Sequence, residues 1–296
     1  MPTLISRISA IALAMVMLGG AAGHDRGAGP AVGWGGNSPG QEIGPAPHGI
    51  FLAVAGGGYH SLGLRADGTL VGWGNNGSGQ INVPEGIFSA IAAGGYHSLA
   101  IRADGTLVAW GASGPTVPTG TFTAVAAGEY HSVALRTDGT IVAWGNDLYG
   151  LTKVPAGTFT AIAAGHYHNL ALRADGTLAG WGFNGFGEAT VPAGTFTAIA
   201  AGRYYSLALR PDGTIVTWGL NDYGQGDVPA GTFIAIAAGY LHGVALDTDG
   251  RLVAWGNNTE GQTDVPNGSF IEIASGYHHG LALRGPRPNR GPLNGR

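Results

Sequence analysis

The sequence predicts an all-β fold, a seven-bladed β-propeller that is closed by an N-terminal strand joining the C-terminal blade. Three observations support this prediction. The dipeptide Trp-Gly occurs seven times and accounts for every tryptophan in the chain. Glycine is abundant, with 56 residues, which suits short strands joined by tight turns. The repeats also begin with the last strand of a unit and end with the second strand of a unit.

The first segment, residues 1–23, has the layout of a secretory signal peptide, because Arg7 precedes an apolar run from Ile8 to Leu18 that ends in small residues. The alternative is a membrane anchor, but the run is shorter than the roughly 20 residues that a spanning helix needs. We therefore expect a secreted or periplasmic protein that does not bind a membrane. The rest of the chain divides into a linker (24–30), a single propeller domain (31–284) and a disordered tail (285–296).

Each unit of the repeat is expected to contain three short strands. The patterns TFTAIAAG, SLALR and TLVAWG alternate apolar with small residues, as half-buried strands do. A turn at G-x-Y-H joins the first strand to the second, and a hairpin at A-D-G joins the second to the third. A loop and a Val-Pro segment then lead to the next unit.

The spacing of the Trp-Gly strands gives the number of blades. Successive tryptophans lie 39, 37, 34, 37, 37 and 37 residues apart, which is a propeller or solenoid period. The last unit, ASGYHHGLALRG, has no third strand, and AVGWGG at residues 31–36 can supply it. This pairing closes a ring and removes exposed edges, whereas a linear solenoid would leave both ends uncapped. The tryptophans are Trp34, Trp73, Trp110, Trp144, Trp181, Trp218 and Trp255.

The units AAGxYHSLALRxDGTxVAWGxNxxGQ resemble the regulator-of-chromosome-condensation repeat, in the short bacterial form that also builds the type II β-lactamase inhibitor protein. The resemblance extends from Ala31 to Arg284. It implies a seven-bladed propeller sealed by its two termini. It also implies that the loops on one face bind a protein. In the β-lactamase inhibitor, the corresponding loops bind the enzyme that it inhibits.

Successive turns of an antiparallel meander alternate between the two ends of a blade. The G-x-Y-H turns and the loops after Trp-Gly therefore share one face, which we call the top face, and the A-D-G hairpins lie at the bottom face. We expect the seven tryptophans and seven of the nine phenylalanines to be packing framework. These phenylalanines are Phe51, Phe88, Phe122, Phe159, Phe196, Phe233 and Phe270.

Two columns of top-face positions vary in chemical type from blade to blade, as a binding surface does and a framework does not. The turn column is Gly58, Gly95, Glu129, His166, Arg203, Tyr240 and Tyr277. The loop column is Pro39, Ser78, Tyr149, Phe186, Tyr223 and Glu260, with Phe183 nearby. A third, regular column is Tyr59, Tyr96, Tyr130, Tyr167 and Tyr204, for which packing and binding roles both remain open. The predicted binding residues are Tyr149, Phe186, Tyr223, Phe183, Glu129, His166, Arg203, Tyr240, Tyr277, Tyr130, Tyr167 and Tyr204.

A histidine recurs once in each blade except the fifth, where Tyr205 replaces it. A metal site would break this symmetry to gather three or four ligands. We therefore expect a structural role, in which a ring nitrogen satisfies backbone groups of the turn, and no metal or cofactor. The histidines are His60, His97, His131, His168, His242 and His279.

The aspartates of the A-D-G, P-D-G and T-D-G hairpins are expected to form the turns, and the arginines beside them are expected to form a solvated rim on the bottom face.

Composition narrows the function further. The chain has 14 Lys+Arg against 18 Asp+Glu, so it lacks the basic footprint of a nucleic-acid binder, and it has no cysteine for disulfides or thiol chemistry. We expect a monomeric, exported, non-catalytic propeller that binds a protein partner, or a surface polymer, through its aromatic top face. The top loops contain no tryptophan, which separates the chain from the inhibitor. The alternatives are a metal- or His-dependent hydrolase or lyase that uses the central shaft, and a structural envelope module.

Overall fold

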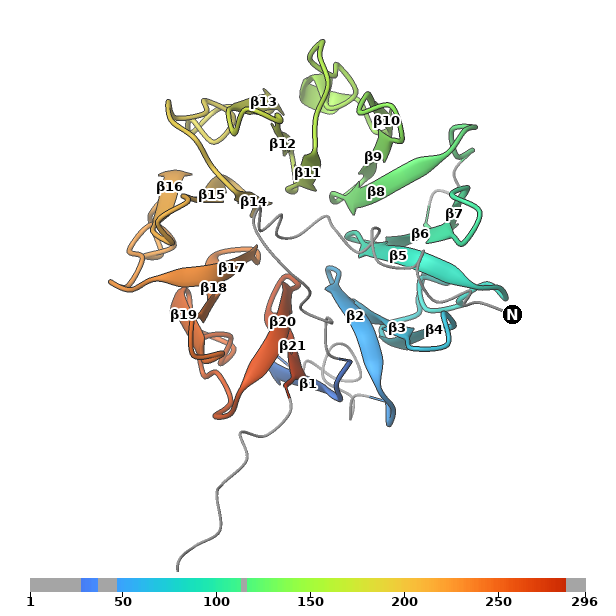
Figure 1. Ribbon diagram of the computed structural model, residues 1–296, viewed down its shortest axis with the longest axis horizontal. Coiled ribbons are helices and arrows are strands. Elements are labelled where there is room, and N and C mark those ends of the chain that lie inside the picture. Colours follow the sequence, from blue (N-terminus) through green and yellow to red (C-terminus); the bar gives the residue numbers. More distant parts are fainter. Residues whose placement is uncertain (1–27, 37–46, 113–115, 286–296) are drawn as a thin grey trace, which may run out of the picture.

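The computed structural model describes residues 28–36, 47–112 and 116–285. These residues form seven three-stranded antiparallel sheets around a central shaft, which confirms the predicted propeller (Figure 1). The expected signal peptide, Pro39 and the tail from residue 286 lie outside the described residues. Within the described part of the chain, no helix is long and apolar enough to cross a membrane.

The inner strand of each blade borders the shaft, and we number the blades 1 to 7 in the order of these strands (Figure 1). The inner strands are β2 (Phe51–Gly56), β5 (Phe88–Ala93), β8 (Phe122–Ala127), β11 (Ala161–Ala164), β14 (Ala198–Ala201), β17 (Phe233–Ala238) and β20 (Phe270–Ser275). The middle strands are β3 (His60–Arg65), β6 (His97–Arg102), β9 (His131–Arg136), β12 (His168–Leu172), β15 (Tyr205–Leu209), β18 (His242–Asp247) and β21 (His279–Arg284). The outer strands are β4 (Leu70–Gly74), β7 (Leu107–Gly111), β10 (Ile141–Gly145), β13 (Leu178–Gly182), β16 (Ile215–Gly219), β19 (Leu252–Gly256) and β1 (Ala31–Gly35).

Blade 7 takes its outer strand from the other end of the chain, as the count of strands predicts. Strand β1 pairs antiparallel with β21, with Ala31 opposite Leu283 and Trp34 opposite Gly280. The pairing extends beyond the expected strand, because Gly29 forms an isolated bridge with Phe51 of blade 1. The N-terminal segment therefore connects blade 7 with blade 1.

The hydrophobic core is divided among the junctions between blades. In one such cluster Val133 and Leu135 of blade 3 pack with Phe159, Ile162 and Trp181 of blade 4. All seven framework phenylalanines are at most 4% exposed, so their predicted packing role is confirmed. Burial of each such side chain contributes roughly 1.5–3 kcal/mol to folding.

The tryptophans also anchor the top loops. Five of the indoles donate an Nε1–H hydrogen bond to a loop carbonyl of the preceding blade. These bonds run from Trp34 to Gln262 (3.0 Å), Trp110 to Gln80 (2.8 Å), Trp181 to Leu151 (2.9 Å), Trp218 to Glu188 (2.8 Å) and Trp255 to Gln225 (2.9 Å). The corresponding loops before Trp73 and Trp144 include residues outside the described ranges.

The repeated histidines join each blade to the next, and not to the backbone of their own turn as the sequence suggested. Each imidazole Nε2 lies within hydrogen-bonding distance of a serine or asparagine side chain in the following blade. The pairs are His60 with Ser98 (2.8 Å), His97 with Ser132 (2.9 Å), His131 with Asn169 (2.7 Å), His168 with Ser206 (2.8 Å), His242 with Ser275 (2.9 Å) and His279 with Ser61 (3.0 Å). Tyr205 completes the circle by donating its hydroxyl to the His242 carbonyl.

The first glycine of each G-x-Y-H turn makes room for this histidine. A Cβ on Gly128 would lie 2.1 Å from Cε1 of His131 and 2.6 Å from the carbonyl oxygen of Gly165. No side chain fits there, so glycine is required by close approach and not by a positive φ.

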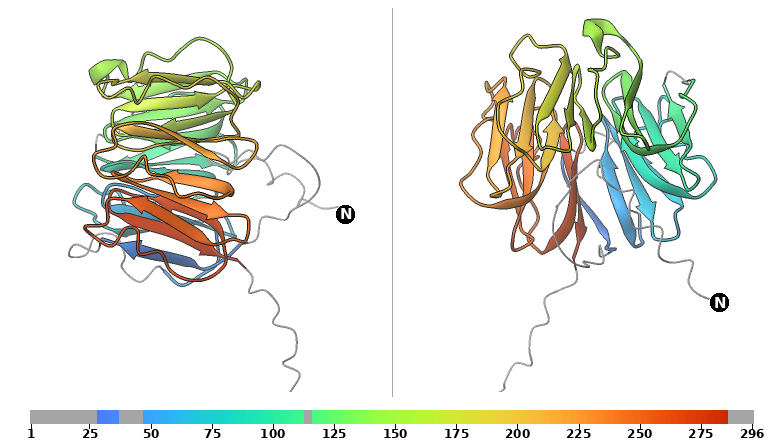
Figure 2. Two further views of the ribbon diagram at one scale, coloured as in Figure 1. Left: turned by 90° about the vertical axis from the view of Figure 1, so that its left-hand side faces the viewer. Right: turned by 45° about the horizontal axis from the view of Figure 1, so that its top comes forward.

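The bottom face matches its predicted structural role, with one correction. Five of the six hairpin aspartates accept hydrogen bonds from the threonine two residues later, as Asp67 does from the Thr69 amide (2.9 Å) and hydroxyl (2.7 Å). Asp249 instead accepts a hydrogen bond from the Arg251 guanidinium (2.8 Å). The arginines were expected to form a solvated rim. Four of them instead cover the framework phenylalanines, as Arg136 does with its guanidinium carbon 5.1 Å from the centre of the Phe122 ring. The edge-on view separates this face from the face that bears the 3₁₀ turn η1 (Leu148–Gly150) (Figure 2).

We predict that the protein loses stability as the pH falls from 6.5 to 4.5. Burial lowers the pKa of His60, His168, His242 and His279 to about 3 and that of His97 and His131 to about 4. Below pH 6.5 the unfolded chain therefore binds more protons than the folded chain, and each histidine costs about 1.4 kcal/mol per pH unit. Denaturant unfolding at successive pH values measures this slope. His97→Gln should make it shallower by about one proton, and a stability that stays constant down to pH 5 would contradict the prediction.

Ring closure gives a second prediction. Removing residues 24–36 takes away β1 and leaves Ile273 and Ala282 of blade 7 without the packing of Trp34. We expect the melting temperature to fall by more than about 10 °C, because loss of a buried tryptophan alone costs roughly 3–5 kcal/mol. Removing only residues 24–27, which leaves β1 in place, is the control, and an equal melting temperature for the two deletions would refute closure by β1.

Candidate functional site

The top face is built from two kinds of segment that are tied together in each blade. The amide after the outer strand bonds to the carbonyl of the turn tyrosine, as Asn75 does with Tyr59 (2.8 Å) and Phe183 with Tyr167 (2.7 Å). The predicted sharing of one face by turns and loops is therefore confirmed.

Buried side chains hold the tips of the top loops. Gln80, Glu188, Gln225 and Gln262 are at most 1% exposed. Each accepts a hydrogen bond from the amide two residues earlier, at distances of 2.7–2.9 Å. The residues whose amides are held in this way are the loop-column residues Ser78, Phe186, Tyr223 and Glu260. These four loop-column residues are therefore displayed from a fixed backbone.

Five of the predicted residues form one contiguous group, which we call the aromatic patch: Tyr149, Tyr167, Phe183, Phe186 and Tyr204. Ring centres lie 4.8 Å apart for Tyr149 and Phe183, 5.2 Å for Phe186 and Tyr204, and 5.7 Å for Tyr167 and Tyr204. Tyr149 is 51% exposed and Phe186 is 49% exposed. The patch is thus rigid, apolar and open to a partner.

Tyr149 has an unusual backbone. Its φ of 68° makes it the one non-glycine residue with a positive φ among the described residues. An L-residue pays roughly 1 kcal/mol or more for this conformation, and strain of this kind concentrates at functional sites. The strained backbone directs the Tyr149 ring toward Phe183 and Tyr167.

The structure separates Tyr223 from the patch. Tyr223 is 52% exposed on the same face, but it makes no ring contact within the described part of the chain. The sequence could not predict this separation, because Tyr223 holds the same position in its repeat as Phe186 does in the preceding one. Tyr223 therefore serves as a matched control for the patch.

The turn column packs into a second group at the mouth of the shaft. The Tyr277 ring lies over Gly58 and Gly95, since a Cβ on these glycines would lie 2.9 Å and 2.7 Å from Tyr277 atoms. The ring of His166 lies 4.2 Å from that of Tyr277 and 4.7 Å from that of Tyr240. The residue type varies along the turn column at these positions because the large Tyr277 ring occupies the space above Gly58 and Gly95.

Arg203 links the two groups. Its guanidinium carbon lies 4.6 Å from the ring centre of Tyr204, in the patch, and 4.3 Å from that of Tyr240, at the shaft mouth. The remaining tyrosines of the regular column continue around the mouth, with ring centres 6.0 Å apart for Tyr59 and Tyr96 and 5.7 Å for Tyr96 and Tyr130. Tyr130 is 45% exposed.

Two titratable side chains, Glu129 and His166, meet at the shaft mouth, where Oε2 of Glu129 lies 3.4 Å from Nδ1 of His166. Burial lowers the pKa of His166 and outweighs the opposing influence of Glu129, so its imidazole is neutral at pH 7. Burial alone would raise the pKa of Glu129, but contacts with His166 and Tyr167 and the charge of Arg203 lower it below its usual value. Glu129 is therefore an ionised, nearly buried carboxylate.

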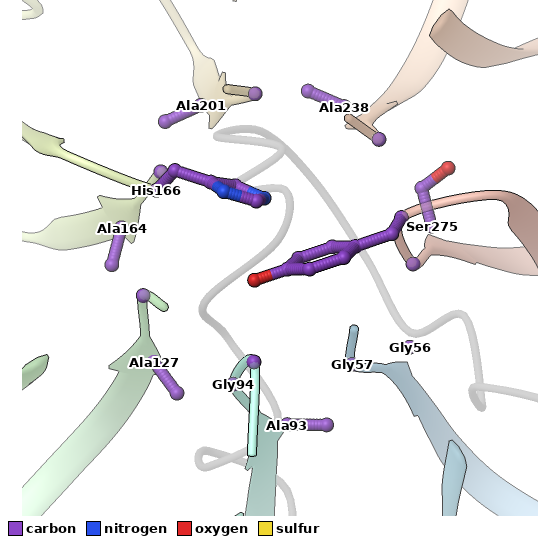
Figure 3. Close-up of a pocket in the computed structure, with 17 residues that line it drawn as sticks. Gly56, Gly57, Ala93, Gly94, Ala127, Ala164, His166, Ala201, Ala238 and Ser275 are labelled. Atoms are coloured by element: carbon purple, nitrogen blue, oxygen red, sulfur yellow. The ribbon is translucent and has the colours of Figure 1, made fainter. Parts of the chain in front are cut away.

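A cavity of about 60 Å³ lies at this end of the shaft. Its walls are the glycines and small residues at the ends of the inner strands, and His166 points into it (Figure 3). Tyr277 also lines the cavity. The described residues contain no group of three or more His, Asp or Glu side chains arranged to hold a metal ion.

The comparisons with known proteins agree with this architecture. The regulator of chromosome condensation (RCC1) repeat matches residues 51–80, 88–114, 122–151, 159–188, 196–225 and 233–262, which is more than half of the chain. The chain belongs to the RCC1 repeat family. The matched RCC1 repeats include the G-x-Y-H turns, and five of them end at a buried loop residue (Gln80, Leu151, Glu188, Gln225 or Gln262), so they account for most of the scaffold of the top face. A comparison with curated proteins gives no significant match.

Solved structures share the RCC1 fold at low sequence identity. Prp20p from Saccharomyces cerevisiae is 18% identical with a TM-score of 0.75, covering 91% of this chain and 92% of that one. The CRINKLY WD40 ectodomain of the Arabidopsis thaliana receptor kinase ACR4 is 21% identical with a TM-score of 0.65, covering 76% and 89%. Human WBSCR16 is 18% identical with a TM-score of 0.66, covering 83% and 93%. These similarities concern the fold.

The strain at Tyr149 can be measured. We predict that Tyr149→Gly is more stable than Tyr149→Ala by about 1 kcal/mol, because glycine adopts a positive φ without strain while both variants lose the ring. Denaturant unfolding compares the two. At Phe186, where φ is not positive, the order should reverse, with Phe186→Ala the more stable variant. The same order at both positions would show that Tyr149 is unstrained.

Proposed function

We propose that the protein is exported, acts as a monomer and binds a protein partner through the aromatic patch without catalysing a reaction. The observation that supports this proposal is the patch itself, in which half-exposed aromatic rings are held on a fixed backbone. Rigid tyrosine and phenylalanine side chains provide contact area at a low cost in conformational entropy. Leu148, 56% exposed beside Tyr149, adds aliphatic surface of the kind that protein interfaces bury.

The fold is compatible with such a role. Prp20p, which shares it, is described by its binding properties to Gsp1p and histones. The repeated histidines are an unsuitable basis for a hydrolase or lyase, since each is buried with Nε2 paired to a neighbouring blade. His166, the one histidine among the described residues that line the shaft cavity, has no such pairing.

Affinity capture tests the proposal. The purified protein is immobilised and exposed to the extracytoplasmic fraction of its host, beside a Tyr149→Ser, Phe186→Ser double variant and the matched variant Tyr223→Ser. We expect a protein that is retained by the wild type and by Tyr223→Ser and is lost with the double variant, because only the double variant removes patch rings. Circular-dichroism melting curves confirm that each variant folds.

Other outcomes point elsewhere. Equal retention by the wild type and the double variant would refute binding through the patch. A glycan retained without protein would favour a surface polymer as the ligand, and no retained molecule would favour a structural envelope module. An identified partner that is an enzyme would then be assayed for inhibition.

A further inference from the structure

Three described asparagines are followed by glycine, a pair that can react without an enzyme. The backbone nitrogen of the glycine can attack the asparagine side-chain amide, because glycine has no side chain to hinder the approach. The pairs are Asn76–Gly77, Asn184–Gly185 and Asn267–Gly268, and all three asparagines are exposed. A fourth pair, Asn294–Gly295, lies outside the described residues. Local hydrogen bonds therefore decide which of the described pairs reacts.

The side-chain amide of Asn184 is held in place. Its Oδ1 accepts a hydrogen bond from the Ala189 amide (2.9 Å), and its Nδ2 donates to the Thr190 hydroxyl (2.9 Å). Attack by the next backbone nitrogen requires a particular and sparsely populated conformation of the side chain and backbone. A carboxamide fixed by two hydrogen bonds adopts that conformation less often, so the loop protects Asn184.

Asn76 is held in the same way, and its attacking nitrogen is also engaged. Oδ1 of Asn76 accepts a hydrogen bond from the Ile81 amide (3.1 Å), and Nδ2 donates to Oδ1 of Asn82 (2.8 Å). The Gly77 amide, which would have to attack, donates to Oδ1 of Asn75 (2.9 Å). Both partners of the reaction are thus restrained at this pair.

Asn267 has neither restraint. Within the part of the chain that the structure describes, its side-chain amide forms no hydrogen bond and the Gly268 amide donates none. Both residues are exposed to solvent. The main-chain carbonyl of Asn267 does form a hydrogen bond, which it accepts from Nη1 of Arg284 (3.3 Å). The reacting groups of this pair are therefore free to meet.

Arg284 also makes the attacking nitrogen more reactive. The Asn267 carbonyl and the Gly268 amide belong to one peptide group, so a cationic donor at the oxygen makes the N–H more acidic. Arg284 is kept at this position by a second contact, because its guanidinium carbon lies 5.3 Å from the centre of the Phe270 ring. The carbonyls of the other two asparagines accept instead from uncharged backbone amides.

We propose that Asn267 is a site of spontaneous deamidation, which converts it into aspartate and isoaspartate. A base removes the proton of the Gly268 amide, and the nitrogen forms a bond to Cγ of Asn267. The bond from Cγ to Nδ2 breaks, and Nδ2 takes up a proton and leaves as ammonia. Water then opens the cyclic imide. Addition of water at Cγ gives aspartate, and addition at the main-chain carbonyl carbon gives isoaspartate, whose backbone runs through Cγ.

The site lies where the chain enters blade 7, which closes the ring. Phe270 begins β20, is 2% exposed, and donates its amide hydrogen bond to the Gly250 carbonyl (2.8 Å). Isoaspartate at position 267 adds one carbon to the main chain just before this anchor. We therefore expect the modification to weaken the entry to β20 in the blade that joins the two ends of the propeller.

Peptide mapping by tandem mass spectrometry tests the proposal on purified protein stored in mildly alkaline buffer. We expect Asn267 to deamidate at least ~10-fold faster than Asn76 and Asn184, since each of those has to give up two hydrogen bonds. In concentrated urea the three rates should converge, because the fold makes the difference. Equal rates in the folded protein, or a rate at Asn267 that folding lowers as much as the other two, would overturn the proposal.

Two variants test the causes separately. Thr190→Val removes a partner of the Asn184 side chain and should speed deamidation there about 5-fold without changing Asn267. Arg284→Leu keeps an apolar cover on Phe270 but removes the cation, so the rate at Asn267 should fall about 3-fold. An unchanged rate at Asn184 in the first variant would refute protection by hydrogen bonds, and an unchanged rate at Asn267 in the second would refute activation by Arg284.

Melting curves test the structural consequence. Stored wild-type protein should melt roughly 2–4 °C lower than fresh protein, the shift that loss of about one hydrogen bond causes in a domain of this size. Asn267→Asp carries the new charge without the extra backbone atom and should melt above the isoaspartate form. Asn267→Gln, whose longer side chain forms the imide far more slowly, should keep its melting temperature during storage. An equal decline in Asn267→Gln and the wild type would show that modification of Asn267 does not weaken blade 7.

Discussion

The hydrogen bond from one blade's histidine to the next blade is the interaction on which the rest of the structure depends. Six imidazoles and the Tyr205 hydroxyl connect all seven junctions into a closed circle. The imidazole lies against the turn glycine, so the turn has one conformation, and the residue after that glycine is directed to the shaft mouth. Scaffold and site are therefore linked through the same four-residue turn.

The two parts of the top face differ in how they are supported. In the patch, Phe183 and Phe186 stand on a loop that is held by the buried Glu188 carboxyl and by the Trp218 indole, so the Phe186 ring is displayed outward. The residues of the shaft mouth are supported by one another, through contacts such as that of His166 with Tyr277. A partner would meet a fixed apolar surface beside a small polar opening, and the first supplies contact area while the second supplies selectivity.

The sequence was sufficient for the fold, because seven equally spaced Trp-Gly strands and an incomplete last unit leave one simple way to close a ring. It also placed turns and loops on one face. It could not show that Tyr277 fills the space above Gly58 and Gly95, since this contact joins residues about two hundred positions apart whose chemistry has no common pattern. Nor could it separate Tyr223 from Phe186, which hold the same position in adjacent blades.

Closure by β1 has a consequence for the way the chain folds. The pairing of Ala31 with Leu283 joins the two ends of the domain, so it cannot form until the last blade has been synthesised. Contacts this distant in sequence form slowly, because a long loop must close first. Until then blade 7 lacks its outer strand and the incomplete propeller has unpaired edges that can associate with other chains. The final step of folding is thus also the step that protects the protein from aggregation.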